Sequence, residues 1–558
     1  MTKITFLPNH VTIEVPLETT ILAASRQAGV LIESPCNGVG TCGKCKVRLQ
    51  PQEQFRVIQA GVHHLSAEEA AQGFVLSCET KVIGDITVEV INKQEENETL
   101  KILQFGKSFD IEVHPLIRKL YSAHQETTLV FAGNRLLGEE PGNTTEKLYG
   151  LSVDIGTTTL VVSLVDLNSG EEIHSESALN PQSLHAQDVL SRIKFASDEE
   201  GLHTMYTDLI QELNQLISKV VQVGKVDPAN IYEAIFSGNT CMIHLATKVD
   251  PRSLGQYPYI PKLTGDSLIP SAELGLNIAD FGLVYLPPII SAYVGPDITS
   301  GVLAANLPTQ SGVTLFVDIG TNGEMVIGQD GQLSATSTAA GPAFEGMNIT
   351  HGMRAGVGAI EYFNVEEDGS IIVKTIGDAE ATGICGSGLL DIVGELVAHG
   401  VINKSGRFVD ADKVQIPANL QERLVKVDGK PAFQVAAGVY LTQKDVRQVQ
   451  LAKGAIRAGI EFLLKAKAIK SGNVHQVLIA GSFGYHLRAK SLINIGLLPE
   501  EFQGKIEFIG NTSKSGGQAF LVNHGYRNDM KKVVDAVEVV ELANYQDFDK
   551  VFVACLGF

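Results

Sequence analysis

The sequence is organised around Leu151 to Leu160, LSVDIGTTTL, and a second stretch of the same kind, Thr314 to Glu324, TLFVDIGTNGE. In each stretch an apolar run predicts a buried strand that ends in Asp-Ile-Gly-Thr. A second apolar run follows at once, which predicts a hairpin. Turns at Asn168-Ser169-Gly170 and Asp330-Gly331 then open third strands. The chain therefore contains an internal repeat of about 160 residues, which predicts two related halves.

The turns of the two hairpins have the chemistry of a phosphate site. Gly156 and Gly320 let the main chain approach an anion closely, and the backbone N–H groups of a tight turn can face it. Asp154 and Asp318 stand where the first strands end, and a carboxylate there suits a hydrated Mg²⁺ held against phosphate. The candidate residues are Asp154, Gly156, Thr157 and Thr158 in the first DIGT loop and Asp318, Gly320, Thr321, Asn322 and Gly323 in the second DIGT loop. One such motif alone favours an ordinary hairpin turn, whereas two in matching strand contexts favour a nucleotide site.

The duplicated loops resemble the phosphate-binding loops of the superfamily that includes acetate and sugar kinases, actin and the 70-kDa heat-shock proteins. In that superfamily two related halves close over a nucleotide. The resemblance implies an actin-like, ribonuclease-H-like module that binds ATP. It also implies that the turn after a buried strand receives the adenosine, here Gly481, Ser482 and Gly484. A Gly-Ser-Gly turn that feeds a helix adds two candidate phosphate-facing residues, Gly386 and Ser387.

The second strong signal is a set of four cysteines near the N-terminus: Cys36, Cys42, Cys45 and Cys78. Three thiolates on one glycine-rich loop, with a fourth brought in by the fold, suit a [2Fe–2S] cluster. The glycines at 38, 40 and 43 let backbone N–H groups point at the sulfurs. A zinc site with four thiolates and unligated thiols are the alternatives. Zinc ribbons usually show two C-x-x-C pairs, and this chain has one.

The cysteine segment resembles a plant-type ferredoxin domain, although its first gap is one residue longer than the plant-type spacing. The resemblance implies a β-grasp fold that carries one electron. Two side chains near the DIGT loops have ordinary interpretations. Glu324 could position water or metal, but we expect an exposed residue at a strand edge. Cys385 is expected to be a buried thiol, as are Cys241 and Cys555.

Composition limits the other functions. The 558 residues suggest three or four domains, and the net charge of −19 argues against nucleic acid and against an anionic membrane surface. The sequence has no apolar run long enough to span a membrane and no signal pattern at its start, so we expect a cytoplasmic protein. Seven cysteines are too few for a disulfide scaffold in a chain of this length.

These features predict a multidomain α+β and α/β protein. We expect a [2Fe–2S] ferredoxin-like domain over residues 1–92 and an actin-like ATPase module over residues 148–558. Between them, residues 93–147 are expected to form a polar linker with a small hairpin, built from strands at 128–131 and 135–138.

The motifs in chain order resemble the ATP-dependent reductive activators of corrinoid proteins over nearly the whole chain. After the cysteine segment they read SVDIGTTT, SGNT, VDIGTNGE, GPAFEG, GICGSGLLD, LTQKDVRQVQLAKGAIRAGI and IAGSFG. The resemblance implies that the four cysteines ligate iron and that ATP with Mg²⁺ binds at the DIGT loops. One electron would pass from the cluster to Co(II) of a partner corrinoid protein, which regenerates Co(I) for methyl transfer. An upstream electron donor and a second copy of the chain, as a homodimer, are further candidate partners.

Other classes of function stay open on the sequence. The chain could donate electrons under ATP control to another low-potential enzyme, such as a radical-forming dehydratase. It could also be a regulatory ATPase whose cluster senses the redox state. A small-molecule kinase is disfavoured, because a dedicated ferredoxin domain would then have no role.

Overall fold

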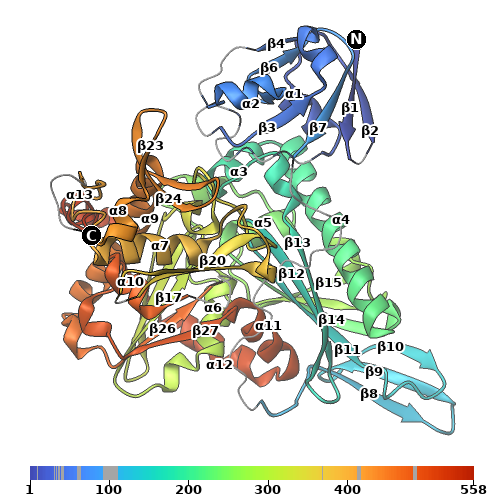
Figure 1. Cartoon of the computed structure of the whole chain (residues 1–558). Helices are drawn as coiled ribbons and strands as arrows, with labels where there is room; N and C mark the ends of the chain where they lie inside the picture. The colour runs from blue at the N-terminus through green and yellow to red at the C-terminus, as the bar shows by residue number, and fades with distance from the viewer. Residues whose placement is uncertain are drawn as a thin grey trace. The chain divides into compact units, whose positions relative to one another are not determined.

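The structure, a computed structural model, describes residues 1–8, 10–30, 32, 34, 38, 40, 43–59, 64–91, 111–366, 368–410, 416–481 and 487–558. The chain divides into two compact units. The first comprises Met1–Glu98 and Asn180–Leu209, and the second comprises Thr99–Leu179 and Ile210–Phe558. Figure 1 labels the helices and strands of both units.

The N-terminal part of the first unit is a five-stranded sheet with the strand order β2-β1-β7-β3-β5. Its strands are β1 (Thr2–Leu7), β2 (Val11–Val15), β3 (Lys46–Leu49), β5 (Phe74–Leu76) and β7 (Ile86–Val90), accompanied by the pair β4 (Val57–Gln59) and β6 (Thr80–Val82) and the helices α1 (Ile21–Gln27) and α2 (Ala67–Ala71). Strands β1 and β7 are parallel, and the other neighbours are antiparallel. Alternate residues such as Ile4, Phe6 and Val88 are fully buried on one face of the sheet. This mixed sheet is the expected β-grasp arrangement.

Side-chain caps determine where both helices in this part begin. Helix α1 begins at Ile21 because the Thr20 hydroxyl accepts a hydrogen bond from the backbone N–H of Ala23. Helix α2 begins with a capping box between Ser66 and Glu69. The remainder of the first unit contains α3 (Val189–Phe195) and the start of α4 (Glu199–Gly224).

A three-stranded antiparallel sheet opens the second unit, with the order β10-β9-β8. Its strands are β8 (Ile117–Ser122), β9 (Thr127–Ala132) and β10 (Arg135–Pro141). The expected hairpin is therefore present as β9 and β10, and β8 adds a strand that the sequence did not predict. The buried Lys119 ammonium pairs with Glu140 at 2.8 Å and donates to the Tyr232 hydroxyl at 2.6 Å. Since Tyr232 belongs to β14 (Ile231–Gly238), this polar cluster attaches the small sheet to the first half of the nucleotide module.

Two six-stranded sheets form the rest of the module, and they confirm the internal repeat. The first has the order β13-β12-β11-β14-β16-β15 and the second β27-β26-β17-β18-β19-β28. The strands are β11 (Tyr149–Ile155), β12 (Thr159–Asp166), β13 (Glu172–Leu179), β14 (Ile231–Gly238), β15 (Ser267–Pro270) and β16 (Leu283–Leu286), then β17 (Val313–Ile319), β18 (Gly323–Gln329), β19 (Gln332–Thr338), β26 (Gln476–Ala480), β27 (Ile506–Gly510) and β28 (Glu538–Val539). Three antiparallel strands followed by two parallel ones recur in both sheets. This shared five-strand core defines the actin-like fold.

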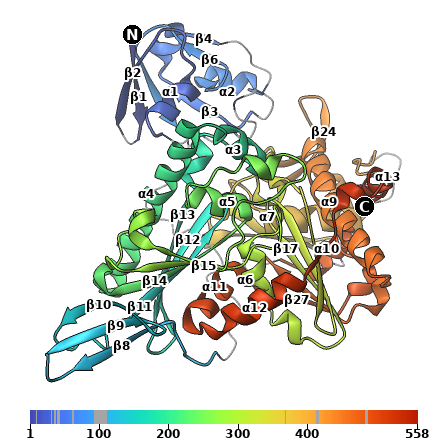
Figure 2. The same cartoon turned by 180° about the vertical axis from the view of Figure 1, so that it is seen from behind.

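Helices α6 (Pro296–Ala304) and α11 (Thr512–Val522) share one apolar core with strands of both sheets. Figure 2 shows the two helices beside each other. They pack closely because glycines face the contact: a Cβ on Gly516 would lie 2.0 Å from the Ser300 carbonyl oxygen. A Cβ on Gly301 would lie 2.7 Å from the Phe316 ring in β17. Both helices begin near the ends of strands that carry the DIGT loops, so their N-terminal residues reach the site.

The second half carries additional elements beside its six-stranded sheet. They are the sheet of β20 (Ala359–Val365), β21 (Ile371–Thr375) and β22 (Gly383–Ile384), the sheet of β23 (Leu424–Val427), β24 (Lys430–Ala436) and β25 (Val439–Thr442), and the helices α7 (Gly386–Ala398), α8 (Ala418–Gln421), α9 (Gln443–Ala466), α10 (Ala489–Asn494), α12 (Gly525–Ala536) and α13 (Phe548–Ala554); α5 (Thr240–Ala246) belongs to the first half. Thr442 and Asp445 form a capping box that opens α9. Within the part of the chain that the structure describes, no helix combines the length and the apolar character needed to cross a membrane.

Candidate nucleotide and cluster sites

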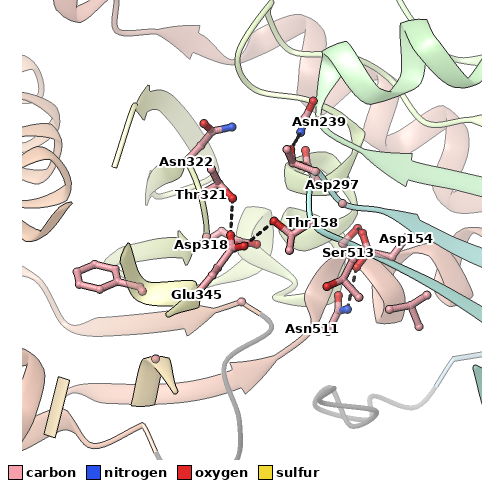
Figure 3. Close-up of a pocket in the computed structure, with 18 of the residues that line it drawn as sticks. Asp154, Thr158, Asn239, Asp297, Asp318, Thr321, Asn322, Glu345, Asn511 and Ser513 are labelled. Carbon is pink, nitrogen blue, oxygen red and sulfur yellow. Dashed lines mark hydrogen bonds between the residues drawn. The ribbon is translucent and has the colours of Figure 1, made fainter. Parts of the chain in front are cut away.

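A cavity in the second unit is lined by residues of both halves (Figure 3). It contains about 1280 Å³ of space that no atom fills, part of which is open solvent at its mouth. The lining includes these residues of the two DIGT loops: Asp154, Gly156, Thr157, Thr158, Asp318, Gly320, Thr321 and Asn322. The structure therefore brings the two loops, which are far apart in sequence, to one cavity.

The two DIGT loops are tight hairpin turns of slightly different shape. In the first, the N–H of Gly156 donates to the carbonyl oxygen of Thr159 at 3.0 Å. In the second, the N–H of Gly320 donates to the carbonyl oxygen of Asn322 at 2.9 Å. A Cβ on Gly156 would lie 2.5 Å from the Thr159 oxygen, whereas one on Gly320 would lie 3.6 Å from the Asn322 oxygen. Only the first turn is therefore closed to any side chain by its own backbone.

Asp154 is held in place by the N-terminal end of α11. Asn511 donates its side-chain N–H to one carboxyl oxygen of Asp154 at 2.8 Å, and the Ser513 hydroxyl donates to the other at 2.7 Å. Burial nevertheless raises the pKa of Asp154 above its ordinary value. Asn511 also caps α11 by accepting from the backbone N–H of Lys514. Sequence reasoning missed Asn511 and Ser513, because nothing near the DIGT motif in the chain points to them.

Further acidic side chains converge on the same cavity. Burial, and then the neighbouring Asp154 carboxyl, raises the pKa of Asp318. Burial and Asp318 likewise raise the pKa of Asp297, which lies in the first turn of α6. Burial, Asp297 and Asp318 raise the pKa of Glu324. In all three groups burial is the largest cause of the raised pKa, and the neighbouring carboxyl groups raise it further.

The expectation for Glu324 was wrong. Its side chain is 6% exposed, and its strand β18 lies between β17 and β19 rather than at an edge. An alternating strand pattern does not reveal whether the outward face is covered by another element, and here that face lines the cavity.

Glu345 links the two DIGT loops. The Thr158 hydroxyl donates to one of its carboxylate oxygens at 2.5 Å, and the Thr321 hydroxyl donates to the other. Figure 3 shows this carboxylate between the two threonines. Glu345 ends a short 3₁₀ turn, Pro342–Glu345. The sequence motif GPAFEG drew attention to this segment, but it gave no sign that its glutamate bridges the loops.

The glycine turns of the second half also reach the cavity. Gly386 and Ser387 lie at the start of α7 and line it, as does Gly481 at the end of β26. Ser482 and Gly484 lie outside the described residues. Cys385 is buried as expected, and its thiol donates to the Ile360 carbonyl oxygen at 3.2 Å.

Two other predicted features can be placed. Asn239 of the SGNT motif caps α5 and donates to the Thr157 hydroxyl at 3.0 Å, which ties this turn to the first DIGT loop. Cys241 is buried as expected, whereas Cys555 is half-buried.

The cavity fits a nucleotide with a hydrated divalent cation. Buried carboxylates without matching positive charge favour a cation, and the turns offer hydroxyl and backbone donors for phosphate. Among the described residues no three carboxylate, imidazole or thiol side chains converge closely enough to hold a metal directly. A Mg²⁺ ion here would therefore be held through its waters and the phosphates, with Asp154 and Asp318 as the nearest carboxylates on the loops.

The cysteine segment fits an iron–sulfur cluster as far as the structure describes it. The Sγ atoms of Cys45 and Cys78 lie 3.2 Å apart, although 33 positions separate them in sequence. Their contact lowers the pKa of Cys45 to about 6, which favours the thiolate that iron requires. Gly38 has a φ of +84°, and a Cβ there would lie 3.8 Å from the Cβ of Cys78, so the glycine-rich loop passes directly beside this cysteine. Cys36 and Cys42 lie outside the described residues.

Sequence families match both parts of the chain. Residues 4–82 match the 2Fe-2S iron-sulfur cluster binding domain. Residues 149–310 match the RACo middle region, and residues 312–558 match the C-terminal domain of RACo, the ASKHA domain. Fold and site thus define the class: an iron–sulfur domain of ferredoxin type joined to an actin-like nucleotide-binding module.

Similar full-length proteins identify the family. The corrinoid activation enzyme RamQ of Eubacterium limosum is 30% identical over 94% of both chains. The [Co(II) methylated amine-specific corrinoid protein] reductase of Methanosarcina barkeri is 22% identical over 74% of this chain and 77% of its own. The solved structure of a reductive activator for corrinoid, iron-sulfur protein superposes with a TM-score of 0.74 and 30% identity, covering 100% of this chain and 98% of that one. The chain belongs to the family of ATP-dependent reductive activators of corrinoid proteins, and it is an enzyme, a reductive activase.

Proposed function

We propose that this protein regenerates the Co(I) state of a partner corrinoid protein, passing one electron to Co(II) at the expense of ATP. The observation that carries the proposal is that one chain joins a thiol pair suited to an iron–sulfur cluster to a cavity whose acidic lining comes from both halves of an actin-like module. The substrate is the cobalt of the partner protein, which gains one electron and loses an axial ligand.

The division of labour follows from the two sites. Cys36, Cys42, Cys45 and Cys78 would hold a [2Fe–2S] cluster, which supplies the electron when an upstream donor has reduced it. The two DIGT loops would hold the phosphates of ATP, and Asp154 and Asp318 would orient hydrated Mg²⁺. We assign the cluster domain to residues 1–92, the linker with its small sheet to 93–147 and the nucleotide module to 148–558. Free thiols and a strongly reduced product suit the cytoplasm.

Energetics explain why a nucleotide is needed. Cob(I) is a very strong reductant, so its formation from an ordinary ferredoxin-level donor is unfavourable, and each 100 mV costs about 2.3 kcal/mol per electron. Moving a two-state equilibrium from 1:99 to 99:1 takes about 5.5 kcal/mol of differential binding. Closure of the two halves over ATP can provide a difference of this size by favouring the complex in which cobalt accepts the electron.

The test follows cobalt by its absorption spectrum under anaerobic conditions. The reconstituted protein, reduced beforehand, is mixed with a corrinoid iron–sulfur protein or with a methylamine-specific corrinoid protein, each in its Co(II) form. We expect one of them to be converted to Co(I) only when ATP and Mg²⁺ are both present. Oxidation of the cluster should occur in step with the reduction of cobalt.

Variants separate the two sites. Cys45→Ser should abolish reduction of cobalt while nucleotide binding persists. Asp318→Ala should abolish the ATP-driven reduction of cobalt while the cluster still accepts an electron. Cys555→Ser and Asp529→Ala are the matched controls, because neither residue lines the cavity or belongs to the four candidate cluster ligands. Reduction of cobalt at the same rate without ATP would refute the proposal. ATP binding with a cluster that stays reduced beside Co(II) would instead favour a redox-sensing ATPase.

A further inference from the structure

The lining of the nucleotide cavity is unbalanced in charge. Five carboxyl side chains face it, from Asp154, Asp297, Asp318, Glu324 and Glu345. Among the described residues that line the cavity, one basic side chain is present, that of Arg354. ATP would bring further negative charge into this space, and the charge of a guanidinium does not depend on pH in the working range. Among the described residues that line the cavity, Arg354 is therefore the side chain that can compensate this charge directly.

The backbone places Arg354 beside the phosphate end of the cavity. The chain leaves Glu345, makes a short loop and returns, so that a Cβ on Gly346 would lie 2.3 Å from the carbonyl oxygen of Met353. Glu345 precedes Gly346 in the chain and Arg354 follows Met353, so this contact brings the backbones of Glu345 and Arg354 near each other. Because the Glu345 carboxylate lies between the hydroxyls of both DIGT loops, Arg354 lies next to the loops that would hold the phosphates.

The segment that carries Arg354 is fixed by main-chain hydrogen bonds. The N–H of Met353 donates to the carbonyl oxygen of Ile384 at 2.9 Å, and the N–H of Ile384 donates to the carbonyl oxygen of His351 at 2.8 Å. Ala355 on the other side of Arg354 packs with Cys385 and Ile376. The position of the Arg354 backbone is thus determined before any ligand arrives, which reduces the cost of ordering it on binding.

The guanidinium of Arg354 has an unpaired nitrogen among the residues that the structure describes. The Nε atom of Arg354 is buried without a hydrogen-bond partner, and the side chain makes no ion pair with any residue that the structure describes. Other arginines in buried surroundings of this chain are paired: Arg488 with Asp391 at 3.0 Å and Arg527 with Glu233 at 2.9 Å. The neighbouring Glu345 directs both of its oxygens at the loop threonines instead. A buried donor left unpaired costs about 1–3 kcal/mol, so an arginine in this state is suited to a ligand that completes it.

We infer that Arg354 is a catalytic residue for ATP hydrolysis, donating to the γ-phosphoryl oxygens and stabilising the negative charge that develops on them. The inference rests on the proposed function and names a residue for its nucleotide step. In that step a water oxygen bonds to the γ-phosphorus while the bond from that phosphorus to the β–γ bridging oxygen breaks. ADP leaves with the electron pair of that bond, and the proton of the water passes to the released phosphate or to solvent. A guanidinium carried on a fixed backbone favours the transition state over the ground state, because it meets the charge where it accumulates.

The experiment compares a ground-state and a transition-state ligand on the full chain. The dissociation constants of MgADP and of MgADP with aluminium fluoride are measured by calorimetry for the natural protein, Arg354→Lys and Arg354→Met, together with the rate of phosphate release from ATP. Arg447→Met is the matched control, because Arg447 is an exposed arginine on α9 that does not line the cavity. Thermal unfolding of each variant shows whether it is folded.

We expect Arg354→Met to weaken the aluminium fluoride complex by on the order of 10²–10³-fold and to slow phosphate release by a similar factor. MgADP affinity should change by less than about threefold, since ADP lacks the γ-phosphoryl group. Arg354→Lys keeps the charge but not the planar fork of donors, so its loss of affinity and of rate should be smaller than that of Arg354→Met. If Arg354→Met lost affinity equally for MgADP and for MgADP with aluminium fluoride, or lost none for either, the inference would be overturned while the proposed function remained intact. A natural protein that binds no MgATP would overturn both.

Discussion

Replacing Glu345 tests whether the bridge between the two DIGT loops competes with ATP. The Glu345 carboxylate accepts hydrogen bonds from the hydroxyls of Thr158 and Thr321. If the same hydroxyls serve the phosphates of ATP, Glu345 must release them first. Glu345→Ala is therefore expected to increase the affinity for ATP.

The size of the effect follows from the two hydrogen bonds. A hydrogen bond to a charged acceptor contributes about 1.5–3 kcal/mol net, so the bridge is worth roughly 3 kcal/mol at the low end of that range. Water and the remaining protein recover part of this when the carboxylate is released. A gain of about 1.4–2.7 kcal/mol, which is about 10–100-fold in the dissociation constant of ATP, is the expected result for Glu345→Ala. Glu345→Gln keeps an acceptor but loses the charge, so its gain should be smaller.

The assay is calorimetric titration with ATP at fixed ionic strength, with Mg²⁺ and with EDTA. The comparison without Mg²⁺ matters because a carboxylate beside the phosphates could also serve the metal. Glu366→Ala is the control for the change in net charge. Glu366 is exposed, and among the described residues its carboxylate accepts a hydrogen bond from the Asn364 side chain alone.

An unchanged dissociation constant in EDTA for Glu345→Ala would refute the competition, because the bridge would then lie outside the path of the phosphates. Weaker binding with Mg²⁺, together with unchanged binding in EDTA, would show that the carboxylate serves the metal shell instead. The same gain in Glu366→Ala would attribute the effect to overall charge.

Three further outcomes are expected. Gly156→Ala should destabilise the protein, measured by denaturant unfolding without nucleotide, by about 1–3 kcal/mol, because its Cβ would lie 2.5 Å from a backbone oxygen. Gly320→Ala should cost less than about 1 kcal/mol in the same assay, because its Cβ would lie 3.6 Å from the nearest backbone oxygen. Burial lowers the pKa of Lys453 from 10.5 to about 8, an effect that Cys555 opposes and Arg457 increases. Between these two pH values the unfolded chain therefore binds more protons than the folded protein. As the pH rises through this interval, the free energy of unfolding of the natural protein should increase by about 3 kcal/mol relative to that of Lys453→Met. Removal of divalent cations with EDTA should weaken ATP binding more than ADP binding in the natural protein, measured by the same titration, because the triphosphate carries more charge into an acidic cavity.

The sequence predicted what short-range patterns determine. Each DIGT hairpin pairs residues a few positions apart, so alternation and turn chemistry were enough to place β11 with β12 and β17 with β18. The duplication then predicted the common sheet core. The β-grasp domain was instead implied by the resemblance of the cysteine segment to a plant-type ferredoxin domain.

The sequence could not predict what tertiary packing delivers to the cavity. Asn511 and Ser513 reach Asp154 from 357 and 359 positions away, and Glu345 reaches Thr158 from 187 positions away. None of these contacts leaves a periodic signal in the chain. The error at Glu324 has the same origin, because burial of a strand face depends on elements that lie elsewhere in sequence.

The distribution of charge suggests how the nucleotide can act on the whole module. Asp154 and Asp297 belong to the first half, whereas Asp318 and Glu324 belong to the second, and mutual repulsion contributes to the raised pKa of Asp297, Asp318 and Glu324. Bringing the halves closer without a cation increases that repulsion, whereas Mg²⁺ with a triphosphate replaces it by attraction on both sides. The ligand then binds the closed form more tightly than the open form, and this difference in affinity favours closure. In the proposed function, hydrolysis would remove one phosphate and part of this attraction, so the same carboxylates would then favour reopening.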